Sequence, residues 1–198
     1  HSDDLSYDTD LVVNTPLIDN TLALRLLLGK TDNAGFIDNP YLLSGAQKDI
    51  NDDQTRQARV SLLWQASDDF SLNTSYHYQK INVGDRQATN ETFTGDKYTA
   101  ASRYLQPMEG ELQLASIDAN YELGFATLTA SLSHYDYAHN ERADQTDYYQ
   151  VMDEVYFGNG YYSEVENMSA YNASTVDVVK DSAELRLVSD NEQRLRWL

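Results

Sequence analysis

Alternation of side-chain character along residues 70–79 constrains this chain more than any other sequence feature. In this segment, FSLNTSYHYQ, apolar residues, aromatic residues and one threonine alternate with serine, asparagine, histidine and glutamine. A period of two is the period of a β-strand, whose successive side chains point to opposite faces of a sheet. The segment therefore predicts a strand with one hydrophobic face and one polar face. Whether lipid or a second protein layer covers the hydrophobic face distinguishes a membrane protein from a soluble one.

The same period returns along most of the chain, in segments bounded by turn residues. The predicted strands are residues 5–14, 21–31, 55–66, 70–81, 111–122, 125–139 and 181–189, with a short stub at 194–198. We therefore predict an all-β fold, an antiparallel up-and-down meander of about seven to eight strands.

Short and long connections alternate strictly between these segments. TPLIDN, SDDF, ELG and DNEQ make the short ones, and residues 32–54, 82–110 and 140–180 make the long ones. The short turns therefore share one edge of the sheet. Outer-membrane barrels have this asymmetry, with strands that alternate apolar-out and polar-in, whereas a soluble sandwich does not require it. The pattern predicts part of a larger transmembrane β-barrel.

Arginines identify the face that should meet water. In residues 55–66, Ala58, Val60, Leu62 and Trp64 oppose Arg59 and its polar neighbours. An arginine on the lipid face at the bilayer midplane costs about 2–4 kcal/mol. We therefore expect three arginines to face the lumen: Arg25, Arg59 and Arg186.

Aromatic residues beside the short turns predict an interfacial girdle, although aromatics also simply favour strands. The girdle residues are Trp64, Phe70 and Tyr121. Two segments break the alternation: 111–122 is mixed on both faces, and Tyr135 and Tyr137 fall on the inward side. A β-bulge or emergence from the membrane would explain either.

Composition narrows the chemistry. Asp and Glu outnumber Lys and Arg by 32 to 14, giving a formal charge of -18, which disfavours nucleic acid and anionic membrane surfaces as partners. The chain has no Cys, and its four His lack metal-ligand spacing. No catalytic motif occurs, so we expect no enzyme, no metal and no cofactor. The acidic stretch DINDDQ (49–54) lacks the EF-hand glycine and distal glutamate and is interpreted as a solvated loop.

Segment 140–180 is unusually rich in tyrosine. Rings on a rigid scaffold give contact area at little entropic cost, so we take them as candidate ligand contacts. The same rings could instead pack the loop against its neighbours. A bound ligand would be a sugar or a catecholate-type iron chelate. The candidate residues are Tyr148, Tyr149, Tyr156, Phe157, Tyr161 and Tyr162.

Several motifs, taken in order, resemble the barrel region of TonB-dependent outer-membrane receptors of the iron-complex type. They are NTPLIDNTLALRLLLG (14–29), GFIDN (35–39), DIND (49–52), ARVSLLWQASDDFSL (58–72) and AELRLVSDNEQRLRWL (183–198). The resemblance implies a barrel of about 22 strands in the bacterial outer membrane. It further implies an N-terminal plug and uptake of a scarce ligand, such as a siderophore–iron complex, with energy from the TonB complex.

Neither the plug nor the final barrel strands are present in this sequence, so we interpret it as a fragment of the barrel domain, residues 1–198. Membrane lipid would surround it in the parent. Made alone, it would expose two sheet edges and a greasy face, which predicts self-association.

Two alternatives stay open. The chain could be a small eight-stranded outer-membrane barrel, an adhesin or structural protein, in which the first and eighth strands pair. It could also be a soluble β-sandwich that binds carbohydrate, in which the Leu and Tyr faces pack against each other.

Overall fold

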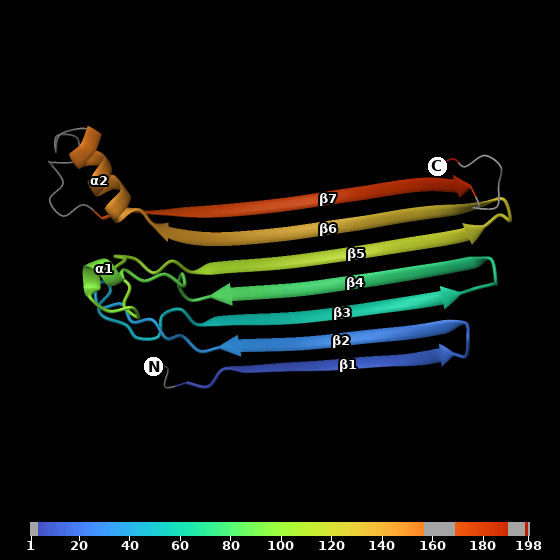
Figure 1. Ribbon diagram of the computed structural model, residues 1–198, viewed down its shortest axis with the longest axis horizontal. Coiled ribbons are helices and arrows are strands. Elements are labelled where there is room, and N and C mark those ends of the chain that lie inside the picture. The colour runs from blue at the N-terminus through green and yellow to red at the C-terminus, as the bar shows by residue number, and fades with distance from the viewer. Residues whose placement is uncertain (1–3, 157–168, 190–196, 198) are drawn as a thin grey trace.

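In the part of the chain that the structure describes, seven antiparallel strands form one sheet in the order of the sequence (Figure 1). The computed structural model describes residues 4–156, 169–189 and 197. The strands are β1 (Tyr7–Ile18), β2 (Leu22–Asn33), β3 (Asp53–Gln65), β4 (Phe70–Val83), β5 (Met108–Glu122), β6 (Ala126–Asp144) and β7 (Tyr171–Ser189). The predicted antiparallel meander is confirmed.

The sheet is open. Strands β1 and β7 form its two edges and do not pair with each other (Figure 1). The predicted eighth segment, 194–198, lies outside the described residues apart from Trp197. The backbone N–H of Trp197 donates to Ser189 Oγ at 2.8 Å, and its carbonyl accepts from the Ser189 N–H at 3.0 Å.

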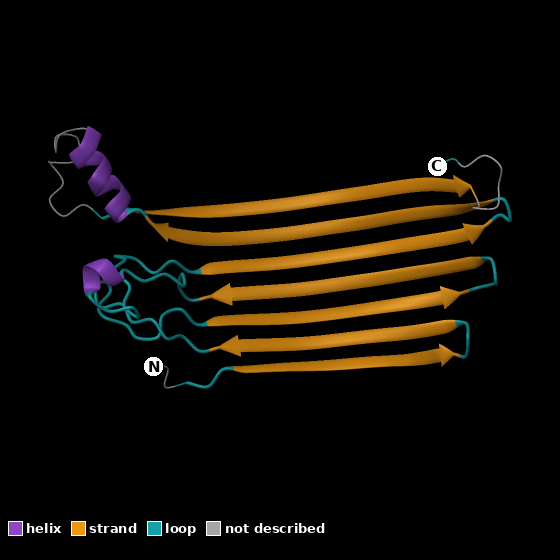
Figure 2. Ribbon diagram, in the orientation of Figure 1, coloured by secondary structure: helices purple, strands orange, loops and turns teal. Residues whose placement is uncertain are grey.

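The short and long connections lie at opposite ends of the strands, as predicted (Figure 2). We call these ends the short-turn edge and the long-loop edge of the sheet. Residues 19–21, 66–69 and 123–125 turn the chain at one edge, and residues 34–52, 84–107 and 145–170 connect strands at the other. Left-handed backbone positions in the short turns are taken by Asn20 (φ 56°) and Gly124 (φ 81°), residue types that tolerate positive φ.

The last two strands are longer than the sequence predicts, so the predicted 140–180 loop is wrong at both ends. The β6 strand continues to Asp144 and β7 begins at Tyr171. The early part of β7 pairs with β6 throughout, for example Val176 with His139. Among the described residues of the long connections lie the helices α1 (Glu91–Thr94) and α2 (Thr146–Tyr156). Neither is long and apolar enough to cross a membrane.

Buried apolar residues gather in the loops and not beneath the sheet. Among the described residues, the hydrophobic cluster consists of Ile37, Ile50 and Ala100, with Leu105 packed against it. The sheet itself is a single layer, and Leu132 is 56% exposed. The face-to-face packing that a sandwich requires is therefore not present in the described part of the chain.

Candidate functional site

The strand register sorts side chains onto two faces. Residues directly opposite one another across neighbouring strands form a register row, and all members of a row share a face. We call one surface the apolar face. It carries Leu11, Leu26, Leu28, Val60, Leu62, Tyr76, Ile117, Leu132 and Leu185. The opposite surface is the polar face.

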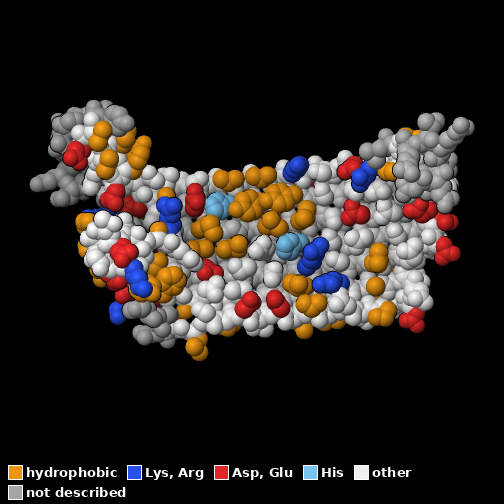
Figure 3. Space-filling view, viewed as in Figure 1, with side chains coloured by type: hydrophobic (Ala, Val, Ile, Leu, Met, Phe, Trp, Pro, Cys, Tyr) orange, Lys and Arg blue, Asp and Glu red, His pale blue; other side chains and the backbone are white. Residues whose placement is uncertain are grey.

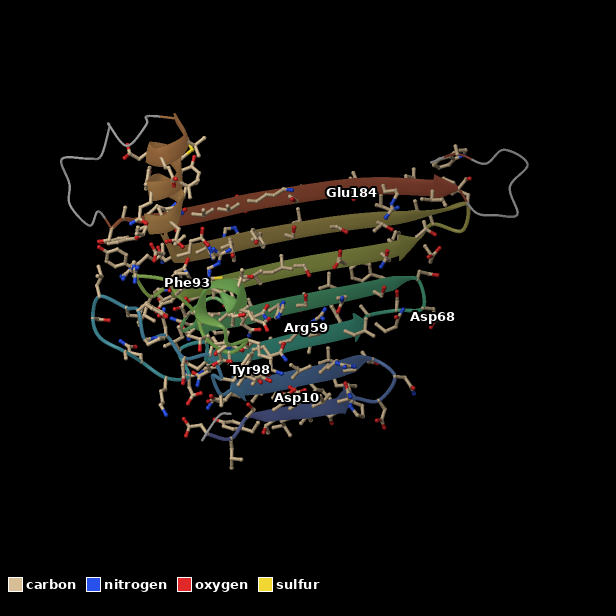
Figure 4. All side chains as sticks on the ribbon, turned by 60° about the vertical axis from the view of Figure 1, so that its left-hand side comes forward. Asp10, Arg59, Asp68, Phe93, Tyr98 and Glu184 are labelled. Carbon is tan, nitrogen blue, oxygen red and sulfur yellow. The ribbon has the colours of Figure 1, made fainter. Side chains whose placement is uncertain are left out.

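The three predicted lumen-facing arginines share the polar face. Arg25 pairs with Ser61, Arg59 with His77, and Arg186 with Thr129. Figure 4 labels Asp10, Arg59 and Glu184 on β1, β3 and β7. One complete row of this face is hydrophilic from β2 to β7, and within it the Ser75 and Ser116 hydroxyls lie 2.9 Å apart. The row consists of Arg25, Ser61, Ser75, Ser116, Ser133 and Ser182.

The aromatic residues predicted to form a girdle contact one another at the short-turn edge. The Trp64 and Phe70 ring centroids are 6.3 Å apart in edge-to-face geometry, and those of Phe70 and Tyr121 are 6.2 Å apart. Such geometries are favourable beyond the area they bury. The three rings therefore form a continuous aromatic row on the apolar face, and its interfacial role stays a prediction.

The apolar face slants relative to the strands. At the short-turn edge, Leu22 shares a row with Leu72 and Ala130. Strand β2 begins in this row, β4 begins two residues beyond it at Phe70, and β6 begins four residues beyond it at Ala126. The edge thus advances by about one residue per strand, a stagger like that of barrel sheets.

The other boundary of the apolar face moves in the same direction. The first charged residues on the long-loop side are Lys30, Arg56, Lys80 and Glu111, which share one row. On β6 the first is Asp136, two residues nearer the short turns, and on β7 it is Asp181, two residues nearer again. Asp181 Oδ1 lies 2.7 Å from His134 Nδ1.

The polar face is interrupted by an apolar patch over β5, β6 and β7 (Figure 3). Tyr135 and Tyr137 have ring centroids 6.2 Å apart, and Tyr137 and His139 have centroids 6.0 Å apart, both pairs stacked. Pairing of β5 with β6 runs unbroken from Met108 to Glu122, so the bulge considered for this region is not present. The remaining patch members are Leu112, Leu114, Val176 and Val178.

Two buried asparagines organise the long loops. Asn51 Oδ1 accepts from the backbone N–H groups of Phe36 and Ile37, both at 2.8 Å. Asn39 Nδ2 donates to the carbonyl and hydroxyl of Ser102 at 3.1 and 2.8 Å. Asn51 is 1% exposed, so the interpretation of 49–54 as a solvated loop is wrong for its centre. The buried Asn51 side chain joins two loop segments through its hydrogen bonds with Phe36 and Ile37.

A cleft of about 400 Å³ lies at the long-loop end, between the α1 loop and α2. Phe93 is 68% exposed, and its ring centroid lies 5.6 Å from that of Tyr41. The guanidinium carbon of Arg103 lies over the Tyr41 ring, 5.8 Å from its centroid. Phe93 and Tyr98 are labelled in the loop cluster of Figure 4. The cleft is lined by Asn90, Phe93, Ala101, Arg103, Asp147, Gln150, Val151 and Glu154.

The predicted tyrosine site is only partly described. Tyr148 and Tyr149 lie on α2 with ring centroids 5.5 Å apart, and Tyr156 is the last residue of that helix. Phe157, Tyr161 and Tyr162 lie outside the described residues. The helix itself was missed, although Tyr148, Val151 and Val155 follow helical spacing. Phe93 and Arg103 were also missed, because isolated residues in a long loop carry no periodic signal.

Two loop carboxyls have shifted pKa values in opposite directions. Burial raises the pKa of Asp85, although the N–H groups of Arg86 and Gln106 donate to its Oδ1. Hydrogen bonds from the Tyr98 N–H and the Thr99 hydroxyl lower the pKa of Asp96.

Within the described ranges, no group of three or more His, Asp or Glu side chains is placed to hold a metal ion. The cleft lining offers one ring, amides and single charges for ligand contact.

Comparison with known proteins adds no assignment. No family model, no curated protein and no solved structure matches this chain.

Proposed function

We propose that this chain is a section of the wall of a larger outer-membrane β-barrel, a TonB-dependent receptor that takes up a scarce ligand such as a siderophore–iron complex. The observation that carries the proposal is the contrast between the two faces of one open, single-layered sheet. Leucines and other apolar side chains cover most of one face, and polar and charged side chains, three arginines among them, cover most of the other.

The exposed apolar face supports a hydrocarbon environment. Val60 is 38% exposed and Leu132 is 56% exposed, and no second layer covers them in the described part of the chain. Contiguous apolar surface of this extent marks a membrane or protein contact. Lipid would cover it in the parent, and the polar face would line a wet interior.

The slant of the apolar face supports a barrel wall. A stagger of one residue, about 3.3 Å, per strand spacing of about 4.8 Å corresponds to a tilt of about 35°. Transmembrane barrel strands tilt by about 35–45°. In a flat membrane, tilted strands shift both boundaries of the apolar zone in the same direction, as they do here.

The open edges and the long loops complete the proposal. The free edges of β1 and β7 would pair with further barrel strands in the parent. Such pairing would satisfy the backbone N–H and C=O groups that an exposed edge leaves unpaired. The long-loop edge would face outward, with the cleft around Phe93 and Arg103 as a ligand-contact surface. Three further parts of the proposal rest on the resemblance to TonB-dependent receptors: the plug, the energising partner and the iron-complex ligand.

Single cysteines test the orientation of the two faces, because residues 1–198 contain no Cys, and any Cys elsewhere in the native polypeptide is first replaced by Ser. The sites of Val60→Cys and Arg59→Cys are adjacent on β3 and face opposite sides. In the native polypeptide in lipid vesicles, a fluorophore on the Val60→Cys variant should be quenched by lipids that carry a nitroxide on their acyl chains. A fluorophore on the Arg59→Cys variant should be quenched by a water-soluble quencher. Equal quenching of both sites by the aqueous reagent would refute a membrane location.

Uptake tests the receptor assignment separately. A strain that lacks the gene should lose growth on a ferric catecholate complex under iron limitation, and the plasmid-borne gene should restore it only when the TonB system is intact. Restored growth without TonB would contradict energised transport.

A further inference from the structure

Three basic side chains meet in one register row of the apolar face. Lys30 is directly opposite Arg56, and Arg56 is directly opposite Lys80. Neighbouring strands lie about 4.8 Å apart, so the three backbone positions fall within about 10 Å. In a chain with 14 basic and 32 acidic residues, this is a local concentration of positive charge. We call these residues the basic row.

The basic row borders the apolar face on its long-loop side. The next row of the apolar face toward the short turns contains Leu28, Ala58 and Tyr78, which are uncharged. In the orientation proposed above, the basic row lies where acyl chains give way to headgroups. Lys and Arg side chains at this depth can place their apolar stems along hydrocarbon and their charges in the headgroup region.

The central member of the row has the least internal compensation. Lys30 Nζ lies 3.1 Å from Asp32 Oδ2, and Lys80 Nζ lies 3.7 Å from Glu111 Oε2. Arg56 is exposed and has no ion pair within the described residues. A guanidinium presents its donors in a planar fork that fits two oxygens of a phosphate.

We infer that the basic row binds the phosphate group of an anionic lipid in the leaflet on the long-loop side. This inference rests on the proposed membrane location. Arg56 would hold the phosphate, and Lys30 and Lys80 would flank it. The neighbouring Leu28, Ala58 and Tyr78 would contact the acyl chains of the same lipid. This apolar contact distinguishes the lipid from free phosphate, which has nothing to bury there.

The chain provides a matched control on the other face. Arg25, Arg59 and Lys180 lie on the polar face, so they carry the same total charge but cannot reach a lipid that covers the apolar face. A triple variant K30Q/R56Q/K80Q and a control variant R25Q/R59Q/K180Q each remove three positive charges. A difference between them therefore reports position and not net charge.

The experiment measures lipid binding to the native polypeptide, purified from membranes in a non-ionic detergent. Phosphatidylglycerol, phosphatidylcholine and inorganic phosphate are each titrated, with retention followed by native mass spectrometry and protection by thermal unfolding. We expect the wild type to prefer phosphatidylglycerol, and the basic-row variant to bind it roughly tenfold more weakly. The control variant should stay within about twofold of the wild type, and the preference should fall as salt is raised.

Three outcomes would overturn the inference. They are equal weakening by the two triple variants, no preference for phosphatidylglycerol, and inorganic phosphate competing as strongly as the lipid. None of these outcomes contradicts the proposed membrane location, which the quenching of the Val60→Cys variant tests separately. If the fluorophore at position 60 instead behaves as an aqueous site, the proposed function fails together with this inference.

Discussion

Leu24 and Leu62 lie directly opposite one another across β2 and β3, on the apolar face, while their chain neighbours Arg25 and Ser61 form the next pair on the polar face. A single step along the backbone therefore changes the environment completely. Because a shift of one residue would exchange the two faces, the register is strongly specified wherever the faces meet different media.

Leu62→Arg should lower the free energy of unfolding of the native polypeptide in lipid by about 2–4 kcal/mol, since Leu62 lies near the middle of the apolar face. Ser61→Arg adds the same charge one residue away on the polar face and should change the stability by less than about 1 kcal/mol. Denaturant unfolding in vesicles measures both. Equal losses would contradict the assignment of the faces.

Trp64 should report the depth of the short-turn edge. Residues 1–198 contain two Trp, so Trp197→Phe leaves Trp64 as their single indole, and any Trp elsewhere in the native polypeptide is replaced by Phe. In vesicles we expect its emission to be quenched most by lipids brominated near the headgroup and less by lipids brominated near the acyl terminus, because an interfacial indole lies at headgroup level. Strongest quenching at the acyl terminus would place the aromatic row in the bilayer centre and refute the girdle.

Asn51→Ala should loosen the long loops without affecting the sheet. The substitution leaves the N–H groups of Phe36 and Ile37 without their acceptor, at a cost of at least about 2 kcal/mol in the local opening equilibrium. Hydrogen exchange at these two amides should accelerate, while the amides of β3 stay protected. Asn172→Ala, at an exposed position of β7, is the control and should leave both unchanged.

Asp85 should make the loop cluster less stable as pH rises. Its folded pKa is raised above the ordinary value of 3.8, so the folded state favours the protonated form. The penalty is absent below 3.8 and complete above the raised pKa. Asp85→Asn removes the charge, so its thermal midpoint relative to wild type should increase from about pH 3 to about pH 7. A constant difference would contradict the burial effect.

Phe93→Ala should weaken ligand uptake through the loop cleft. The ring is exposed and contributes a rigid contact surface beside Arg103, so its removal should raise the KM for uptake of a ferric catecholate complex about tenfold. Leu43→Ala removes a comparably exposed apolar side chain outside the cleft lining and should leave the KM unchanged. Equal effects of both substitutions, or none from Phe93→Ala, would move the ligand contact elsewhere.

Alternation and turn chemistry were enough to predict the meander and the faces of Val60 and Arg59. These properties depend on residues close in sequence, because a period of two fixes which side chains share a face. The sequence likewise predicted which connections share an edge. It missed the first half of β7, residues 171–180, where polar residues on both faces hid a strand that extends by pairing with β6.

The loop site depended on contacts between distant segments. Asn51 belongs to an acidic stretch that suggests solvent, yet it is buried because Phe36 and Ile37 lie against it. Phe93 and Val151 line one cleft although a strand hairpin separates them in the chain.

The sequence by itself therefore determined the number of strands, their order and most of the character of each face, because side-chain alternation is local. Only the tertiary structure decided which side chains became neighbours: the basic row of Lys30, Arg56 and Lys80, the slant of the apolar face and the cleft at the loops. The physical reason is that the pairing register and loop packing join residues far apart in the chain, and no local pattern encodes those distances.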